Sequence, residues 1–597
     1  MLRPQPINPV PDDTARVAHA AFPKGHPYLR LTDECGVLFA DDAFTALFPT
    51  HGQPALAPWR LALVTILQFA EALSDLQAAH ALRSRIDWKY VTRLELTDPG
   101  FDGSVLSEFR SRLIEGAAET LLLDTLLTWC REHKLLGARG RQRTDSTHIL
   151  AAVRALNRIE LVGETLRHAL NDLAVVAPDW LRALSPPAWV ARYARRAEDD
   201  RLPTGKEARE ARALTIGADG AVLLAAVYAP AAPPWLRHVP AVETLRRVWV
   251  QNYYHAGAAD APHLRWWTDD QGIPPASLFV SSPYDPDAHY AKKNTTQWVG
   301  YKVHITETCD DALPSLITHV ETTPGPVADG TVTPIIHACL KDKDLLPRLH
   351  IVDTGFLDAA LLVESQRDYD VGLCGPTRAD YQWQARAGEG FDAYSFSIDW
   401  ERKQATCPEG HTSSGWTPVV DRYGNNIIKV KFSAKKCGPC PSRPRCIRSG
   451  MKCQRRTLSL HTKEEYLALQ EARQRERTED FTQEYARRAG IEGTLSRGVR
   501  TCELRRTRYI GLARVHLGHI VTAAALNFLR LGEWIADVPR AYPRLPHLCV
   551  LKPDASALFA SQRGPSALRR TRDVVPLGRR RGCHRGHLRL RRGNDTG

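Results

Sequence analysis

Apolar residues recur at helical spacing in the first quarter of the chain. Residues 59–73, WRLALVTILQFAEAL, follow this spacing without Gly or Pro, and Ser74 with Gln77 opens the next helix in a capping-box pattern. Residues 104–136 predict one or two further helices. The pattern therefore predicts a helical segment over residues 31–137, preceded by an irregular, Pro-rich arm over residues 1–30.

Strand patterns begin after this helical segment. Residues 141–153, 297–309, 315–323 and 369–378 each predict a strand, and a short apolar run at 349–352 leads directly into Asp353. Residues 154–255 are mainly helical in pattern and interrupt the strands. We expect a mixed sheet over residues 138–378 with a helical insertion at 154–255. Asp145 and Asp353 would lie where ligands commonly bind, at strand ends.

The last third of the chain changes pattern twice. Residues 379–460 are irregular and rich in short strands, and Thr462 with Glu465 predicts the capped start of a long polar helix that reaches about residue 490. Residues 509–535 predict a long, largely buried helix. The sequence therefore favours a multidomain α+β protein. Its core would comprise residues 138–378 and 461–535, with a β-rich insertion at 379–460.

Charge is unevenly distributed. The net charge is +13, but residues 563–597 carry +9 of it as 11 Arg and 2 Asp. The segment 536–597 is predicted to be disordered and to attract polyanions, or to be the product of a shifted or read-through reading frame. We find no run of about 18 apolar residues and no apolar segment at the N-terminus. These features predict a soluble cytoplasmic protein without a membrane partner.

Thirteen cysteines are few for 597 residues, but several cluster in the β-rich insertion. A structural zinc site would use Cys407, Cys437, Cys440 and Cys446, with His411 or Cys453 as substitutes for one ligand. The spacing is irregular, so reduced thiols without metal are an equal alternative. Such a site would brace the insertion and would not be catalytic.

Three acids form a candidate catalytic set: Asp145, Asp353 and Glu492. Tyr485, Arg488 and Glu492 are spaced by three and four residues, so one helix would present them on one face. Carboxylates are the ligands that Mg²⁺ prefers, and two such ions about 3.5–4 Å apart activate a nucleophile and stabilise a leaving oxygen in phosphodiester cleavage. The simpler alternative is that each Asp is a turn or cap residue and Glu492 a solvated helix acid.

These motifs resemble those of DDE transposases of bacterial insertion sequences, in the IS-four-like superfamily. The resemblance covers roughly residues 30–535. It rests on QFAEALSDLQAAHALRSRIDWKYVTRLELTDPGFDGSVLSEFRSRL near the N-terminus, TDSTHI around Asp145, VDTGF around Asp353, and YARRAGIEGTLSRGVR, which matches a Tyr-Arg-Glu signature. That signature usually ends in Lys or Arg after six intervening residues. Val499 occupies this place, so Arg497 or Arg500 would supply the basic member.

The resemblance implies an all-α N-terminal DNA-binding domain and a ribonuclease H-like core. Asp145, Asp353 and Glu492 would bind two Mg²⁺ or Mn²⁺ ions, and Tyr485, Arg488, Arg497 and Arg500 would contact DNA. It further implies an enzyme, acting as a homodimer near the bacterial nucleoid. This enzyme would bind the terminal inverted repeats of its element, hydrolyse the 3′ ends and join them to target DNA by transesterification.

Two rival functions come from the same residues. One is a catalytically inactive DNA-binding remnant or regulator of such an element, which would keep the helical N-terminal segment and the basic tail. The other is a phosphohydrolase with an aspartyl-phosphate intermediate at Asp145. That chemistry generally requires a second Asp two residues later, where this chain has Thr147. The three intact acids favour the transposase.

Overall fold

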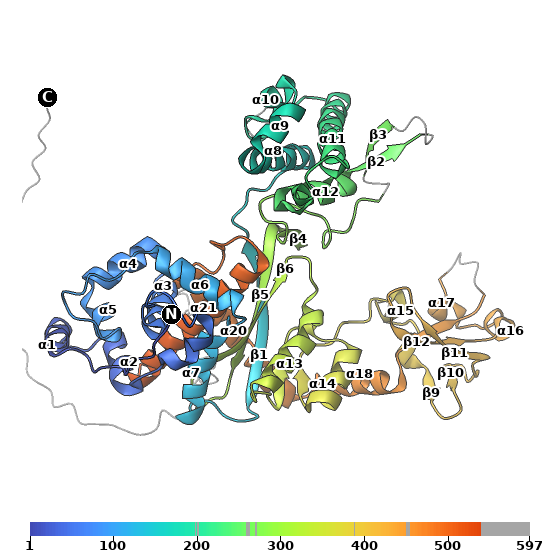
Figure 1. Cartoon of the computed structure of the whole chain (residues 1–597). Coiled ribbons are helices and arrows are strands. Elements are labelled where there is room, and N and C mark those ends of the chain that lie inside the picture. Colours follow the sequence, from blue (N-terminus) through green and yellow to red (C-terminus); the bar gives the residue numbers. More distant parts are fainter. Residues whose placement is uncertain are drawn as a thin grey trace, which may run out of the picture. The chain divides into compact units, whose positions relative to one another are not determined.

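The computed structural model describes residues 1–197, 199, 202–257, 263–268, 272–386, 388–448 and 454–538. Most of the predicted tail, from residue 539 onward, and Cys453 therefore lie outside the described residues. The described part is a mixed helix and sheet protein, as the sequence predicts (Figure 1).

The N-terminal helices pack around one long helix near the C-terminus. Their bounds are α1 (Asp12–Ala21), α2 (Pro27–Cys35), α3 (Pro58–Ala70), α4 (Asp75–Ser84), α5 (Ile86–Val91), α6 (Ser104–Glu115) and α7 (Leu121–Glu132). Helix α21 (Leu512–Ile535) contacts α2, α3, α6 and α7 (Figure 1). The predicted capping box between Ser74 and Gln77 is present. The prediction of an irregular arm is wrong for residues 12–21, because α1 buries Ala18 against Tyr90.

A six-stranded mixed sheet forms the centre of the chain. Its strands are β1 (Arg141–Leu150), β4 (His289–Lys293), β5 (Thr296–Thr308), β6 (Ile317–Pro324), β7 (Leu349–Ile351) and β8 (Gly372–Cys374). The order is β4-β5-β1-β7-β8, with β6 also beside β5. Strands β4, β5, β6 and β1 pair antiparallel, whereas β7 and β8 run parallel to β1.

Strand β5 is long because it changes partner along one edge. Residues 296–300 pair with β4, and residues 301–307 pair with β6. Gly300 sits at this change with φ of 151°, and an added Cβ would lie 2.2 Å from the backbone oxygen of Ile149. Only glycine therefore fits this close approach of β5 to β1.

The sheet shares its hydrophobic core with the N-terminal helices. Buried residues of β5 and β6, helix α13 (Thr333–Asp342), helix α20 (Ala489–Thr501) and α21 belong to one continuous cluster with those helices. Helix α14 (Ala359–Tyr369) packs against helix α18 (Lys463–Arg475) and forms a second cluster. The N-terminal helices, which the sequence suggested as a separate module, thus have no core of their own apart from α1 and its neighbours.

The helical insertion has its own core. It contains α8 (Arg158–Val176), α9 (Pro178–Leu184), α10 (Pro187–Tyr193), α11 (Lys206–Tyr228) and α12 (Pro240–Asn252), followed by the hairpin β2 (Tyr253–Ala256) and β3 (His263–Trp266). A capping box of Asn157 and Glu160 starts α8. The helices fall where the sequence predicts them, and their apolar faces pack against one another.

The β-rich insertion forms a separate small cluster of apolar residues. Its strands are β9 (Ser397–Asp399), β10 (Gln404–Thr406), β11 (Gly415–Val420), β12 (Asn426–Lys431) and β13 (Thr457–Leu460), with short helices α15 (Trp383–Arg386), α16 (Ala434–Cys437) and α17 (Arg443–Cys446). Beyond it, α18 begins at the predicted capping box of Thr462 and Glu465. The single long helix predicted to reach residue 490 is wrong: it divides into α18, α19 (Glu479–Ala486) and α20.

Two described helices, α11 and α21, are long and apolar enough to cross a membrane by length and composition. Neither helix is an unbroken run of about 18 apolar residues, since Asp219 interrupts α11 and Arg530 interrupts α21. Burial explains the apolarity of α21, because 72% of its most apolar window is buried inside the protein. The corresponding share for α11 is 33%, and this helix packs against α8 and α12.

Candidate active site

The parallel register between β1 and β7 brings two aspartates together. The last register pair is Arg143 with Ile351, and Asp145 and Asp353 each follow two residues later. Adjacent strands lie about 4.8 Å apart. Past Arg143, β1 is hydrogen-bonded to β5 but no longer to β7, so the sheet opens at the position of the two carboxylates.

Arg488 links the two aspartates to Glu492. Its Nη2 donates to Asp145 Oδ2 at 2.8 Å and lies 3.9 Å from Asp353 Oδ2, while its Nη1 lies 3.4 Å from Glu492 Oε1. Three acids that are far apart in the sequence therefore face one guanidinium. The structure thus brings together all three predicted catalytic acids.

The three carboxylates differ in their surroundings. Asp145 is buried on β1, where its Oδ1 accepts a hydrogen bond from the backbone N–H of Ser146. Burial raises the pKa of Asp145, with a further contribution from Asp353, while Arg488 and Lys293 act in the opposite direction. Glu492 is the most accessible of the three, with 67% of its side chain exposed.

Helix α20 is held against the sheet by buried charge. Arg143 on β1 donates to Glu307 on β5 through Nε at 2.8 Å and Nη2 at 2.6 Å, and it also donates to the backbone oxygen of Arg487. An added Cβ at Gly490 would lie 2.2 Å from the Arg143 guanidinium. The absence of a side chain at Gly490 therefore allows Arg143 to reach the start of the helix that carries Glu492.

The arginines around Asp145 in the sequence are ion-paired within the chain. Arg139 pairs with Asp370, Arg141 with Glu484 at 2.8 Å, and Arg143 with Glu307. His148 contacts Arg505 and none of the three carboxylates among the described residues. The Nη1 of Arg505 lies 2.8 Å from the His148 Nδ1 and 2.8 Å from its backbone oxygen. The arginines of this stretch therefore serve as ion-pair partners within the chain.

The four predicted DNA-contacting residues are placed differently. Arg488 lies among the carboxylates, and the ring of Tyr485 is half-buried against Phe481 and the ends of β7 and β8. Arg497 forms a two-point ion pair with Glu533 at 2.7 and 2.9 Å. Arg500 is exposed and donates only to the backbone oxygen of Ser496 among the contacts of the described residues. Of the two candidates for the basic member, Arg500 is thus the more accessible.

The basic residues of the N-terminal helices are also engaged. Arg85 pairs with Glu71 and Asp87, and Arg110 is buried beside Asp75. Lys89 is buried and donates to the backbone oxygens of Glu95 and Asp98. These side chains stabilise the helices, and the DNA-binding role that the resemblance implies for this segment stays a prediction.

Two groups that the sequence did not single out lie beside the aspartates. Lys293, at the end of β4, is close enough to Asp145 to lower the pKa of that carboxyl. Asp329, just before α13, lies next to the turn that carries Asp353. Neither belongs to a periodic pattern or a motif, so only the folded sheet reveals them.

Asp285 and Asp287 serve as turn residues before β4. Asp285 is buried and accepts hydrogen bonds from the Tyr301 hydroxyl at 2.7 Å and from Gly511 N–H at 3.3 Å. Asp287 accepts from Leu512 N–H at the first turn of α21. Both therefore fix the start of this helix, where a negative charge is favourable.

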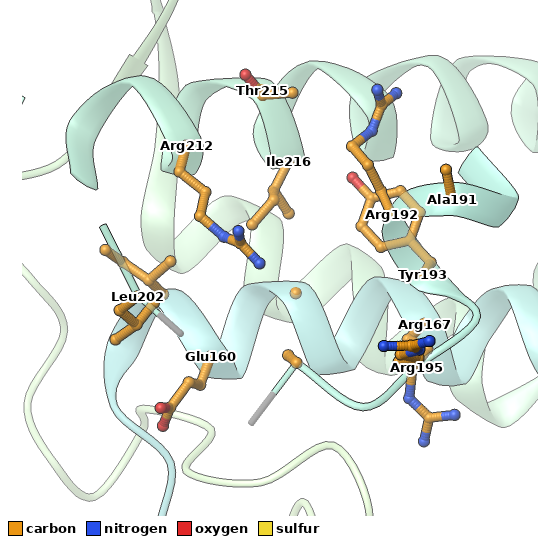
Figure 2. A pocket seen from close by; sticks show the side chains of 13 residues that line it. Glu160, Arg167, Ala191, Arg192, Tyr193, Arg195, Leu202, Arg212, Thr215 and Ile216 are labelled. Carbon is orange, nitrogen blue, oxygen red and sulfur yellow. The ribbon is translucent and has the colours of Figure 1, made fainter. Parts of the chain in front are cut away.

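A large cavity of about 330 Å³ lies in the helical insertion, away from the carboxylates. Arginines from α8, α10 and α11 line it beside Glu160 (Figure 2). Two of these guanidiniums are neutralised nearby, since Arg167 pairs with Glu164 at 2.7 Å and Arg192 with Asp219 at 2.8 Å. These ion pairs therefore offset part of the positive charge that the arginines bring to the cavity.

The predicted zinc ligands share one small cavity. Cys407, Cys437, Cys440 and Cys446 line it together with His411. The Cys407 sulfur accepts a hydrogen bond from the His411 backbone N–H at 3.3 Å in a tight turn. In the described parts of the chain, no three His, Cys, Asp or Glu side chains stand ready-made as a metal-binding group, at this cavity or at the carboxylates. The zinc site accordingly stays a prediction.

Comparisons with known protein families match two parts of the chain. A family described as Transposase DDE domain matches residues 406–532, and one described as Transposase domain (DUF772) matches residues 16–112. The first match includes the cysteine-lined cavity, Arg488 and Glu492. No curated protein and no solved structure matches the chain.

Proposed function

We propose that the chain cuts and joins DNA at Asp145, Asp353 and Glu492, because its matches to a transposase DDE domain and to a second transposase domain support a DDE transposase of insertion sequences. The observation that carries this proposal is the convergence of the three acids on Arg488, at distances of 2.8, 3.9 and 3.4 Å. We further propose a ribonuclease H-like core. The order of the five strands β6-β5-β1-β7-β8, three antiparallel and then two parallel, supports it.

The donor set fits divalent metal. Asp145, Asp353 and Glu492 provide only carboxylate oxygens, which Mg²⁺ and Mn²⁺ favour. Arg488 lies between these oxygens and offsets their mutual repulsion. For all three acids to share ions, the exposed Glu492 must turn inward and Arg488 must yield its place. Two bound ions would activate the attacking hydroxyl and stabilise the leaving oxygen.

The reaction would then consist of two successive displacements at phosphorus. In the first step, water attacks the phosphorus at the element end and the 3′ oxygen leaves as a free hydroxyl. In the second step, that hydroxyl attacks a target phosphodiester, and the 3′ oxygen of the target leaves. A displaced Arg488 is suited to hold a phosphate, because its fork of N–H groups matches two phosphate oxygens. No covalent bond to the protein is required in either step.

The proposal includes the partners and the place of action. The substrate would be double-stranded DNA, namely the terminal inverted repeats of the element and the target. Two copies of the chain would hold two element ends, and the reaction would occur in the cytoplasm of a bacterium, at the nucleoid. Arg500, about two turns beyond Glu492 on the same helix, is the exposed one of the two predicted phosphate contacts on α20.

The test is Mg²⁺-dependent nicking of a duplex that carries one inverted repeat. Replacing Asp145 or Asp353 with Asn, or Glu492 with Gln, should lower the 3′-end nicking rate about 10²–10³-fold, the effect of losing several kcal/mol of charge stabilisation. Binding of the repeat should be retained. Asp358→Asn is the matched control, since this acid caps α14 through Leu361 N–H. Nicking at the wild-type rate by either Asn variant would refute the site.

A further inference from the structure

Two carboxylates flank Gly355, in the turn that follows β7. The N–H of Gly355 donates to Asp353 Oδ1 at 2.8 Å, within the short helix η5 (Thr354–Phe356). An added Cβ at Gly355 would lie 3.0 Å from Asp353 Oδ1 and 3.2 Å from Asp329 Oδ2. Asp329 therefore contacts the turn of a predicted catalytic acid, although 24 residues separate them in the sequence.

Asp329 is held from the other side by β5. Its Oδ1 accepts a hydrogen bond from Lys302 Nζ at 2.7 Å, and only 13% of either side chain is exposed. The Nδ1 of His304, also on β5, lies 3.9 Å from the same oxygen and is buried without a hydrogen-bond partner in the described structure. Lys302 therefore fixes Asp329 and leaves its second oxygen directed toward Gly355.

The two turns are packed closely enough to move together. Asp329 begins the short helix η4 (Asp329–Val332), in which an added Cβ at Gly330 would lie 3.3 Å from the backbone oxygen of Gly355. The Thr333 hydroxyl donates to the backbone oxygen of Phe356 at 2.8 Å. Glycines at both contact points let the two backbones meet, so the turn of Asp329 lies directly against the turn of Asp353.

We propose that Asp329, anchored by Lys302, is a positioning residue for Asp353. It buttresses the turn at Gly355 and so fixes the direction of the Asp353 carboxylate toward the metal. An ordinary capping role does not account for it, because the residue before η4 is Ala328 and Lys302 gives the only hydrogen bond to the Asp329 carboxylate among the described residues. This inference rests on the proposed function, since it assigns Asp353 as a metal ligand.

The test compares metal binding with metal-dependent nicking in the full chain. Mn²⁺ alone is titrated by calorimetry or electron spin resonance, and the Mg²⁺ concentration for half-maximal nicking is measured separately. Mutation of a residue that orients a metal ligand typically lowers metal affinity or activity by about 10- to 100-fold. We expect Asp329→Asn and Lys302→Met to weaken Mn²⁺ binding and to raise the Mg²⁺ requirement by that factor. Lys302→Arg should recover most of the loss, because it keeps the positive charge.

The outcomes separate this inference from the proposed function. Asp358→Asn should bind Mn²⁺ like the wild type, and a matching loss in this control would overturn the inference by showing a general effect of loosening the segment. Folded Asp329→Asn with wild-type Mn²⁺ affinity and Mg²⁺ requirement would also overturn it. Lys302→Met decides the question in the same way if Asp329→Asn does not fold. Wild-type nicking by Asp353→Asn would instead defeat the proposed function itself.

Discussion

Glu307 is the residue whose loss should most clearly uncouple helix α20 from the sheet. Its side chain is completely buried on β5. It accepts from Arg143 at 2.6 and 2.8 Å, from Arg530 Nη1 at 2.8 Å and from the Thr494 hydroxyl at 2.7 Å. The carboxylate thus connects β1, α21 and α20. Glu307→Gln removes its charge with almost no change in volume.

The expected loss of stability arises because two guanidiniums, those of Arg143 and Arg530, are left without their counter-ion. Removing one partner of a buried ion pair costs about 3–5 kcal/mol. Natural domains unfold with about 5–15 kcal/mol, so the variant should be close to the limit of stability. Because Thr494 lies on α20, the same helix that carries Glu492, this helix should loosen first.

The assay is denaturant unfolding of the full chain, combined with amide hydrogen exchange over residues 489–501. Glu533→Gln is the matched control, because Glu533 also makes a two-point pair with an arginine, Arg497, but is 46% exposed. Exposed pairs contribute about 0–1 kcal/mol. An unfolding free energy for Glu307→Gln within about 1 kcal/mol of wild type, with unchanged exchange on α20, would refute the reasoning.

The stability gained from Glu307 should depend on pH in one direction. Burial alone would raise the pKa of Glu307, but Arg530, Arg143 and the hydrogen bond from Thr494 together lower it below its usual value of 4.5. A depressed carboxyl pKa stabilises the fold above the unfolded-state pKa and loses that contribution as the pH falls through the folded-state value. The difference in unfolding free energy between wild type and Glu307→Gln should be largest above about pH 5 and should decrease in more acidic buffer.

Three other predictions separate the roles of single residues. Arg500→Ala should weaken binding of the inverted repeat and lower the salt slope by about 1, as for one lost phosphate contact, whereas Arg497→Ala should leave the slope unchanged because Glu533 already occupies that guanidinium. Salt-titrated binding measurements on both variants check this, and equal slopes would contradict it. Arg488→Met should reduce nicking about 10²–10³-fold, with only partial recovery in Arg488→Lys, because a lysine cannot reproduce the planar fork. Single-turnover nicking rates measure this effect, and full activity of Arg488→Lys would contradict the requirement for a planar guanidinium. Finally, the purified full chain should contain one zinc ion, which Cys440→Ser should lose and Cys339→Ser, outside the insertion, should keep. Elemental analysis measures this, and a metal-free wild-type chain would show that the cysteine cavity holds reduced thiols.

The positions of five central strands, β1, β5, β6, β7 and β8, and of the two aspartates were predictable because they depend on local pattern, whereas β4 lies outside every predicted strand. Strand β1 and the apolar run before Asp353 both fall where alternation and composition place them. Helix starts at Ser74 and Thr462 follow from capping boxes, which are local signals as well. What these patterns do not contain is register. The pairing of Arg143 with Ile351, which sets the two acids side by side, arises only from the folded sheet.

Charge was a poorer guide than hydrophobic pattern. Three basic residues near Asp145 or in the N-terminal helices, Arg110, Arg143 and Lys89, are buried and satisfied inside the protein. A sequence gives the sign of a charge but not its partner. Asp329 shows the converse, since a single acid outside any motif acquires a place at the site through contacts with Lys302 and Gly355.

The break between α19 and α20 explains why Tyr485 lies apart from Arg488 and Glu492. One continuous helix would put Tyr485, Arg488 and Glu492 on a single face, as the spacing suggests. Instead α19 ends at Ala486 and α20 begins at Ala489, with Arg488 at the junction. Tyr485 can then pack against the ends of β7 and β8. Arg488 extends toward Asp145 and also contacts Glu492. The spacing therefore serves a helix junction that anchors one residue in the core and presents the other two to the aspartates.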